Sequence, residues 1–311
     1  MDIARIPSDG ISAGDNWGDL FFHPRFVNAA ADIFKLNGQP VVLSSEGSPV
    51  FVLNLLSRSI GPFKTATIPL LFQYFGAISL KTGLEGKDVV ALNDYLSGFC
   101  DFALFSFPPG FPVEPLRETG WNLRKTMTLA LYEDDLRTWG LNFRDDVKNK
   151  IRKAEKNGVE VDRADAFPAH LWALAYERKG LSAPVNSKSL ARWCDRLISD
   201  SKLRIFAARK NGLAVAFRGE LISGKYAYDW IAGSDPDYHA VGVNQLLMME
   251  IGKSLGASGV RTWDLVGGEI KSIYDFKKSF GAKDAIHFQG EKYFNLKGRI
   301  FCGLRRFKYG R

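Results

Sequence analysis

The sequence predicts an α+β fold of two similar units, each a mixed, mostly antiparallel sheet flanked by helices. The second half has the predicted order helix, helix, three consecutive strands, helix, strand, helix, strand, and the first half has a shortened version of it. The 311 residues suffice for two domains, although no low-complexity linker separates them. We place the boundary ahead of a change in composition, which gives units of residues 1–132 and 133–311.

In the first half, apolar residues at helical spacing predict helices, and short apolar runs bounded by turn residues predict strands. Glu46-Gly47-Ser48 supplies the turn of a hairpin, and Pro108-Pro109-Gly110 ends a buried strand. The predicted elements are helices at 24–36 and 87–99, a hairpin at 41–53, and strands at 102–107 and 125–131.

In the second half, Asn211-Gly212 between two apolar runs is a strong hairpin signal, and Ser223-Gly224 makes a second tight turn. Three consecutive strands joined in this way form an antiparallel meander. The predicted helices lie at 144–156, 164–178, 187–199, around 247–255 and at 273–279. The predicted strands lie at 159–161, 203–208, 213–221, 226–231, 260–265 and 285–288, and Arg305-Arg306-Phe307-Lys308 is read as a basic tail.

The net charge of +8 indicates an anionic partner, such as a phosphate-rich cofactor, a nucleotide-linked substrate, RNA or a membrane surface. A basic protein with no such partner has the same composition. The most basic segment is the helix at 144–156, where six Lys and Arg residues surround an apolar stripe of Val147, Ile151 and Ala154. Its basic face is a candidate binding surface, and a solvated helix face accounts for it equally well.

Cysteine and histidine usage argues against two kinds of site. The three cysteines are widely spaced without a Cys-x-x-Cys pair, and the four histidines are scattered. We therefore expect neither a disulfide framework nor a metal, and a reducing, cytoplasmic setting. The sequence also lacks the apolar core of a signal peptide and any apolar run long enough to span a bilayer.

Two motifs in the second half carry a family resemblance. Residues 144–161 read Arg-Asp-Asp-Val-Lys-Asn-Lys-Ile-Arg-Lys-Ala-Glu-Lys-Asn-Gly-Val-Glu-Val, and Trp263-Asp264-Leu265-Val266-Gly267-Gly268 precedes Phe276-Lys277-Lys278-Ser279-Phe280-Gly281. The first motif resembles the basic helix and strand that open the second unit of Fem-type peptidyltransferases and of related CelD-like acetyltransferases from polysaccharide clusters. The second resembles that group's Tyr-Asp-x-x-Gly followed by Phe-Lys-x-x-Phe-Gly. In the first half, Tyr74-Phe75-Gly76 is similar to the group's Tyr-Gly-Gly turn.

The order of elements likewise resembles the GNAT acyltransferase fold, from about Trp17 to about His287. The resemblance implies tandem GNAT-like units and an acyltransferase. Ordinary GNAT enzymes hold the coenzyme A pyrophosphate with Gln/Arg-x-x-Gly-x-Gly/Ala, whereas residues 239–244 read His-Ala-Val-Gly-Val-Asn, in which only Gly242 matches firmly. Fem-type enzymes use aminoacyl-tRNA and lack this loop, but the sequence lacks the helical coiled-coil insertion of several tRNA-dependent members. The donor therefore stays open between acyl-CoA and aminoacyl-tRNA.

Both donors undergo attack by an amine on an activated acyl carbon, which needs a proton acceptor and positive charge or N–H groups at the oxyanion. Lys277 matches the family lysine, and its implied role is to stabilise the charge of the oxyanion or of the donor; a surface lysine on a short amphipathic helix is the alternative. Asp229, in the central strand, is a candidate acceptor of the amine proton, or else a buried partner of Lys or Arg. Tyr228 is a candidate acid for the leaving group, or else a core aromatic residue.

The candidate donor contacts lie in two loops, one before the helix around 247–255 and one after the strand at 260–265. They are Tyr238, His239, Gly242, Asn244, Gly267 and Gly268. A merely solvated side chain is the alternative for His239.

The sequence thus predicts an N-acyltransferase that moves an acyl group from acyl-CoA to a small-molecule or nucleotide-linked amine, with a sugar or cell-envelope precursor as the candidate acceptor. One alternative is an aminoacyl-tRNA-dependent Fem-type peptidyltransferase, for which tRNA is the partner. Another is a non-catalytic anion- or RNA-binding module on the same fold, because a fold does not establish activity. The sequence makes no prediction of oligomeric state.

Overall fold

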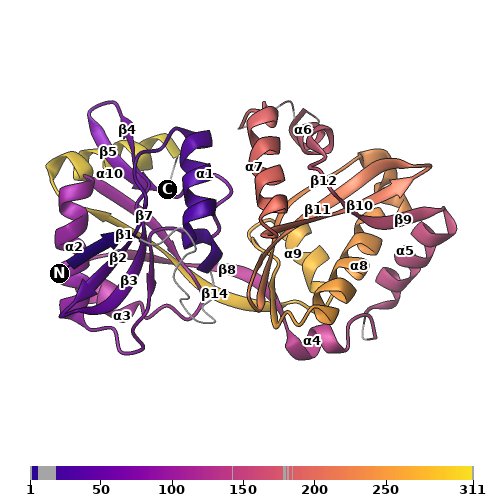
Figure 1. The fold of residues 1–311 in the computed structure, drawn as a ribbon, viewed down its shortest axis with the longest axis horizontal. Coiled ribbons are helices and arrows are strands. Elements are labelled where there is room, and N and C mark those ends of the chain that lie inside the picture. Colours follow the sequence, from indigo (N-terminus) through magenta and orange to yellow (C-terminus); the bar gives the residue numbers. More distant parts are fainter. Residues whose placement is uncertain are drawn as a thin grey trace. The chain divides into compact units, whose positions relative to one another are not determined.

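The structure, a computed structural model, describes residues 2–5, 19–141, 143–177, 180, 182–183 and 185–309 (Figure 1). Trp17, and Arg178 at the end of the predicted helix 164–178, lie outside these residues. The chain forms two compact units: unit 1 is Met1–Thr126 with Ile286–Arg311, and unit 2 is Met127–Ala285.

The chain enters unit 2 within β8 (Asn122–Tyr132) and returns to unit 1 within β14 (Lys283–Tyr293). This division differs from the predicted units of 1–132 and 133–311, because the end of the chain joins unit 1. There β14 pairs antiparallel with β7 (Phe102–Phe107), and α10 (Leu296–Tyr309) contacts β5 and β7.

Unit 1 holds two groups of strands. One is an antiparallel sheet with the order β1-β2-β3-β6; the other has the order β4-β5-β7-β14, in which β5 and β7 run parallel. The remaining strand bounds are β1 Asp2–Arg5, β2 Pro40–Ser45, β3 Ser48–Asn54, β4 Arg58–Ile60, β5 Phe63–Thr67 and β6 Ala77–Ser79. The remaining helices are η1 Asp19–Phe22, α1 Pro24–Phe34, α2 Gly86–Phe99 and α3 Glu114–Glu118.

The core of unit 1 is rich in aromatic rings. Phe21 packs edge-to-face on Phe26 at 5.4 Å and on Tyr74 at 5.7 Å between ring centroids. Gly76 has φ 113°, and a Cβ atom there would lie 2.0 Å from the ring of Phe105. Close packing against Phe105 therefore accounts for the glycine of the Tyr74-Phe75-Gly76 motif.

In unit 2 the strands have the order β8-β13-β12-β11-β10-β9, and β12–β13 is the parallel pair of this series. The strand bounds are β9 Val159–Ala164, β10 Leu203–Lys210, β11 Leu213–Ser223, β12 Tyr226–Ser234 and β13 Thr262–Asp264. The helices are α4 Glu133–Arg137, α5 Asp145–Lys156, α6 Ala169–Glu177, α7 Ser187–Ser199, η2 Pro236–Val241, α8 Val243–Ala257 and α9 Lys271–Lys278.

Helices cover both faces of the sheet in unit 2. Figure 1 shows α6 and α7 over one face and α5 and α8 over the other. Helix α8 makes the crossover that the parallel pair β12–β13 requires. Its buried side packs with α5, whose stripe of Val147, Ile151 and Ala154 is buried as predicted.

The predicted mixed, mostly antiparallel sheets flanked by helices are confirmed, and β7 and α7 have the predicted bounds. The short strands β1, β4, β5 and β6 and the short helices α3 and α4 were not predicted. Helix α10 replaces the predicted basic tail. Its apolar residues lie on two opposite sides of the helix, so its sequence shows no single apolar stripe. Within the described ranges, no helix combines the length and apolar character that crossing a membrane requires.

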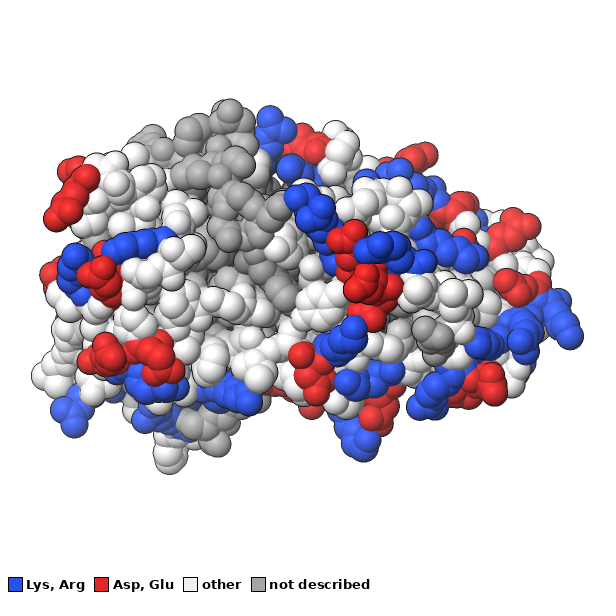
Figure 2. Space-filling model, turned by 90° about the horizontal axis from the view of Figure 1, so that it is seen from below, with Lys and Arg blue, Asp and Glu red and all other residues white. Residues whose placement is uncertain are grey.

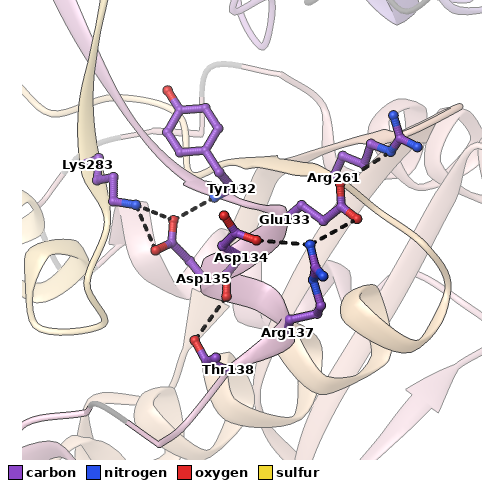
Figure 3. A network of polar contacts seen from close by, with 8 residues as sticks. All are labelled: Tyr132, Glu133, Asp134, Asp135, Arg137, Thr138, Arg261 and Lys283. Carbon is purple, nitrogen blue, oxygen red and sulfur yellow. Dashed lines mark hydrogen bonds and ion pairs between the residues drawn. The ribbon is translucent and has the colours of Figure 1, made fainter.

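A polar network holds α4 where it follows β8 (Figure 3). The carboxylate of Asp135 accepts a hydrogen bond from the Tyr132 N–H at 2.9 Å and pairs with Lys283 of β14 at 2.8 Å. This pairing fixes the first turn of α4 against β14 within unit 2. The network comprises Tyr132, Glu133, Asp134, Asp135, Arg137, Thr138, Arg261 and Lys283.

The contact between α8 and the segment after α4 gives a testable prediction. A Cβ atom at Gly252 of α8 would lie 2.2 Å from the indole ring of Trp139. Gly252→Ala should therefore lower the free energy of unfolding by about 1–3 kcal/mol, measured by urea denaturation, because one of the two must shift. Gly303→Ala in α10 is the matched control: a Cβ there meets nothing within 4 Å, and a gain of up to about 1 kcal/mol is expected. Equal stabilities would contradict this packing.

Candidate functional site

The candidate site lies in unit 2, where β12 and β13 separate. Tyr226–Tyr228 pairs with Thr262–Asp264, and β13 then ends while β12 continues to Ser234. Among the described residues, no strand pairs with residues 229–234 on that side. A cavity of about 580 Å³ opens here, within the size range of small-molecule sites. Its lining comes from Arg218 of β11, residues 229–234 of β12, the segment around the start of α8, and the segment from β13 to α9.

A β-bulge aims this part of β12 into the cavity. The register with β11 runs from Gly219↔Ile231 to Glu220↔Asp229, so Trp230 is the extra residue. Trp230 packs edge-to-face on Trp193 of α7, with ring centroids 5.0 Å apart. The bulge breaks the strict alternation of the strand, and Asp229, Trp230 and Ile231 all line the cavity.

Lys277 lies at the wall of the cavity and is only 6% exposed. Its Nζ donates hydrogen bonds to the carbonyl oxygens of Leu265 at 2.5 Å and Gly267 at 2.9 Å, and to that of Val266. Burial lowers the pKa of Lys277, because an ammonium group loses its hydration there. The three carbonyls accept from the protonated amine. Lys277 is therefore neither a surface lysine nor free of partners: it clamps the loop that follows β13.

The clamped loop has an unusual backbone. Val266 adopts φ 52°, a left-handed conformation that is costly for a β-branched residue, and Gly267 follows with φ 56°. The carboxylate of Asp264 accepts hydrogen bonds from the Val266 N–H at 2.8 Å and from the Thr128 hydroxyl at 2.5 Å. Asp264 thus orients the turn from one end, and Lys277 holds it from the other.

Two carboxyl groups, Glu220 of β11 and Asp229 of β12, lie at paired positions of the two strands. Both interact electrostatically with Lys277. Asp229 forms a buried ion pair with Arg218, and Glu220, fully buried, accepts a hydrogen bond from the Trp263 indole N–H at 2.7 Å. Burial raises the pKa of Glu220, and the negative charge of Asp229 raises it further. Within the described residues, Asp229 Oδ1 and Glu220 Oε1 have no hydrogen-bond partner. A proton on either carboxyl group would satisfy one of these two buried oxygens.

The loop before α8 forms the other end of the cavity. Asn244 and His239 both line it, and His239 Nε2 lies 2.7 Å from the Ser234 hydroxyl. Gly242 caps α8 with φ 94°, and a Cβ atom there would lie 2.4 Å from the Lys150 carbonyl oxygen of α5. Contact with α5 therefore accounts for the glycine, and close approach of a phosphate is not needed to explain it. The N-terminus of α8 still presents the positive end of a 15-residue helix.

The structure brings four of the residues predicted for the site to one cavity: Lys277, Asp229, His239 and Asn244. The buried ion pair with Arg218 that was the alternative for Asp229 is present as well.

The other predicted residues do not line the cavity. Tyr228 is fully buried in β12, the position of a core aromatic residue, and Tyr238 packs on the core that α8 shares with the sheet. Gly242 and Gly268 are buried, whereas Gly267 is exposed. Roles for these residues in chemistry or donor binding stay predictions.

Sequence reasoning missed Arg218 and Glu220. They flank Gly219 in a strand that otherwise reads as apolar, Leu213–Ser223. Opposite charges inside an apolar run were the available signal, because such residues are buried only when they are paired or functional. Phe276 belongs to the Phe-Lys motif, and the sequence predicts no role for it. In the structure its ring centroid lies 5.5 Å from the Arg218 guanidinium, a cation–π contact.

Residues 142–278 match the family model described as "Acetyltransferase (GNAT) domain". This segment of the chain is therefore similar to a GNAT acetyltransferase domain. The bulged strand, the separated parallel pair and the cavity all lie inside this matched segment of unit 2. A comparison with curated protein sequences gives no match.

Solved structures extend the similarity beyond the GNAT domain to the whole fold. The crystal structure of FemX covers 97% of this chain and 99% of its own at TM-score 0.71 and 13% identity. The C-terminal domain of a putative lysylphosphatidylglycerol synthetase from Agrobacterium fabrum gives 0.59 at 14% identity, with 90% and 96% covered. A tandem GNAT protein from the clavulanic acid biosynthesis pathway gives 0.55 at 10% identity, with 94% and 99% covered. The fold is therefore a tandem GNAT fold.

The basic helix α5 packs against η2 and α8, beside the loop that precedes the GNAT crossover helix. Arg152, Lys153 and Lys156 are exposed on it, while Arg144 pairs with Asp146 at 2.8 Å. Figure 2 shows one face of the molecule, on which acidic side chains lie among the basic ones. In the described part of the chain, no group of three or more His, Cys, Asp or Glu residues could hold a metal ion.

The raised pKa of Glu220 predicts how stability depends on pH. Because the folded protein binds this proton more tightly than the unfolded chain, the stabilisation is fully present below the ordinary pKa of 4.5 and is lost as pH rises through the folded pKa. Relative to Glu220→Gln, which cannot ionise, the wild type should lose up to about 1.4 kcal/mol of unfolding free energy per pH unit above pH 5. Denaturation at a series of pH values measures it.

A difference between Glu220→Gln and the wild type that stays constant over this pH range would contradict the raised pKa of Glu220.

Proposed function

We propose that the GNAT domain of unit 2 is an N-acyltransferase that moves an acyl group from acyl-CoA to an amine. The observation that carries the proposal is the 580 Å³ cavity at the unpaired edge of β12, where Lys277 and Asp229 meet. The GNAT family match supports an acyltransferase, and it leaves the donor and acceptor to the residues of the site.

The unpaired edge of β12 suits an extended donor arm. In an antiparallel pair, alternate N–H groups point away from the partner strand, so part of the N–H groups in residues 229–234 points away from β11. These N–H groups can donate hydrogen bonds to the amide carbonyls of an acyl donor that lies extended along the strand. They can also donate to the carbonyl oxygen of its acyl group. The apolar side chains of Ile231, Ile273 and Phe276 in the lining would exclude water from the thioester.

The proposed reaction needs no covalent intermediate on the enzyme. The amine nitrogen attacks the thioester carbonyl carbon, and the tetrahedral oxyanion is stabilised by β12 N–H groups and by the positive charge of Lys277. Asp229 first takes one proton from the ammonium form of the amine, which frees the nitrogen lone pair for the attack. The carbon–sulfur bond then breaks, the thiolate of coenzyme A takes up the second proton lost by the nitrogen, and the products are an amide and free coenzyme A.

Lys277 acts in this scheme by charge and by position. Its three N–H groups donate hydrogen bonds to the loop carbonyls, so its proposed role does not require a direct hydrogen bond to the acyl donor. One oxygen of Asp229 pairs with Arg218, and the other has no hydrogen-bond partner among the described residues. The carboxylate attracts the arriving ammonium group and can take its proton. The acceptor we favour is the amine of a sugar or a cell-envelope precursor, small or nucleotide-linked, as the Fem-type and CelD-like resemblance implies.

Aminoacyl-tRNA is the second candidate donor, because the exposed basic residues of α5 lie on a helix packed against the loop before α8. RNA backbones attract such residues without reading sequence. Gly242, the firm match to a coenzyme A loop, is accounted for by contact with α5, which weakens the sequence argument for coenzyme A without opposing it.

Ligand stabilisation distinguishes the donors. Acetyl-CoA or a longer acyl-CoA at about a hundredfold its Kd should raise the free energy of unfolding by roughly 2.7 kcal/mol, measured as a shift in Tm. Free coenzyme A and uncharged tRNA are the controls for the acyl and aminoacyl groups. A shift with charged tRNA alone would favour the aminoacyl transfer reaction. If no donor shifts the Tm, the result would contradict the proposed enzyme activity and favour a non-catalytic binding module.

The role of Lys277 is tested against its neighbour in the same helix. Once a donor and an acceptor amine are known, Lys277→Ala should lower kcat by about 10²-fold, because the positive charge at the oxyanion is lost. Lys278→Ala removes an exposed lysine of α9 and should keep turnover within about twofold of the wild type. Two controls check that the lower kcat is not caused by unfolding. One is Lys277→Met, which keeps the length of the buried side chain, and the other is circular dichroism of each variant. Unchanged turnover in a folded Lys277→Ala variant would remove Lys277 from the mechanism.

A further inference from the structure

Helix α10 of unit 1 carries an exposed apolar stripe. Leu296, Ile300, Leu304 and Phe307 are 71%, 48%, 57% and 92% exposed. Their spacing of four, four and three residues places them on one face of the helix. Scattered exposed apolar residues need no explanation, but four in a row along one helix face mark an interaction surface.

The opposite face of α10 is fixed in unit 1. A Cβ atom at Gly298 would lie 1.8 Å from the Asp101 carbonyl oxygen, so the helix approaches that backbone as closely as a glycine allows. Phe301 packs on Phe102 and Phe63, with ring centroids 5.3 Å and 5.4 Å apart. Because this inner face is packed, α10 cannot turn its exposed stripe inward without losing those contacts.

Basic residues border the stripe on both sides. At 100° per residue, Lys297 lies on one side of it and Arg299 on the other. The segment 296–307 has four basic residues and no acidic one. Among the described residues, the side chains of Lys297 and Arg299 have no ion pair or hydrogen bond, whereas Arg305 and Arg306 pair with Glu291.

An apolar groove continues the stripe. It has a volume of about 750 Å³ and lies between α10 and the β4–β5 hairpin, which Figure 1 shows beside each other. Leu304 belongs to both the stripe and the groove, and Ile60, Phe63 and Ile68 extend the apolar lining. Arg58 and Arg305 add positive charge to the lining.

We propose that the α10 surface, meaning this stripe, its basic borders and the groove, binds the surface of a bilayer that contains anionic phospholipid. The apolar stripe enters the acyl boundary, Lys297 and Arg299 meet the phosphates, and the groove takes part of an acyl chain. An apolar helix face with basic borders is the pattern of helices that lie in a membrane interface.

Charge decides between a bilayer and a second copy of the chain. Two copies joined through this surface would place basic borders against basic borders, on chains that each carry a net charge of +8. An anionic lipid surface removes that repulsion and complements the same residues. The proposal concerns unit 1 and does not rest on the acyltransferase proposal for unit 2.

Vesicle co-sedimentation tests the proposal on the full chain. Binding is expected to vesicles of phosphatidylcholine with 30% phosphatidylglycerol, with little to phosphatidylcholine alone, and should weaken with added salt. Ile300→Ser with Phe307→Ser should abolish binding, and Lys297→Gln with Arg299→Gln should weaken it about fivefold per residue. Leu213→Ser, at an equally exposed apolar residue of unit 2, is the control and should bind like the wild type.

Each other outcome overturns the proposal. Absence of vesicle binding does so directly, and so does binding that survives the Ile300→Ser, Phe307→Ser double change. A concentration-dependent dimer that this double variant abolishes, seen by analytical ultracentrifugation without lipid, would make the stripe an interface between copies. Because the altered side chains are exposed, Tm should stay within a few degrees of the wild type, so lost binding reports on the surface.

Discussion

Strand β12 pairs with β11 along its whole length but with β13 for only three residues. The candidate site depends on this early end of the parallel pair. On one side, the extra residue Trp230 bends β12; on the other, the left-handed turn at Val266 takes the chain away after Asp264. Two strands that separate leave one edge unpaired, and an unpaired edge inside a protein must meet a ligand or water.

Lys277 makes that separation stable. A β-branched residue at φ 52° and three carbonyls turned to one side are both unfavourable alone. Three hydrogen bonds from one ammonium satisfy the carbonyls and fix the turn at the same time. The same charge then lies at the wall of the cavity, next to the ion pair of Arg218 and Asp229. The structural clamp and the electrostatic role that we propose for Lys277 are therefore consequences of one placement.

Element types and the position of the site were predictable from the sequence, because both depend on local signals. Asn211-Gly212 and Ser223-Gly224 define the meander, and the Trp-Asp-x-x-Gly and Phe-Lys motifs led to Asp264 and Lys277. The residues of the strand edge were only partly predictable. Whether Tyr228 or Trp230 lines the cavity depends on a bulge set by pairing with β11, and no pattern within β12 itself shows it. Arg218 and Glu220 were hidden for the same reason, since their partners are on other strands.

Gly242 shows why a glycine in a ligand-loop position is weak evidence for the ligand. A glycine is required wherever backbone approaches closely, whether the approaching group is a phosphate or another helix. Here the carbonyl of Lys150 occupies the space that a side chain would take. The loop motif therefore explains how α5 packs on the start of α8, and this packing brings a basic helix to the positive end of another helix. Two positive features placed together support the polyanionic donor that we propose more strongly than the glycine does, and they suit the phosphates of a coenzyme and those of an RNA equally well.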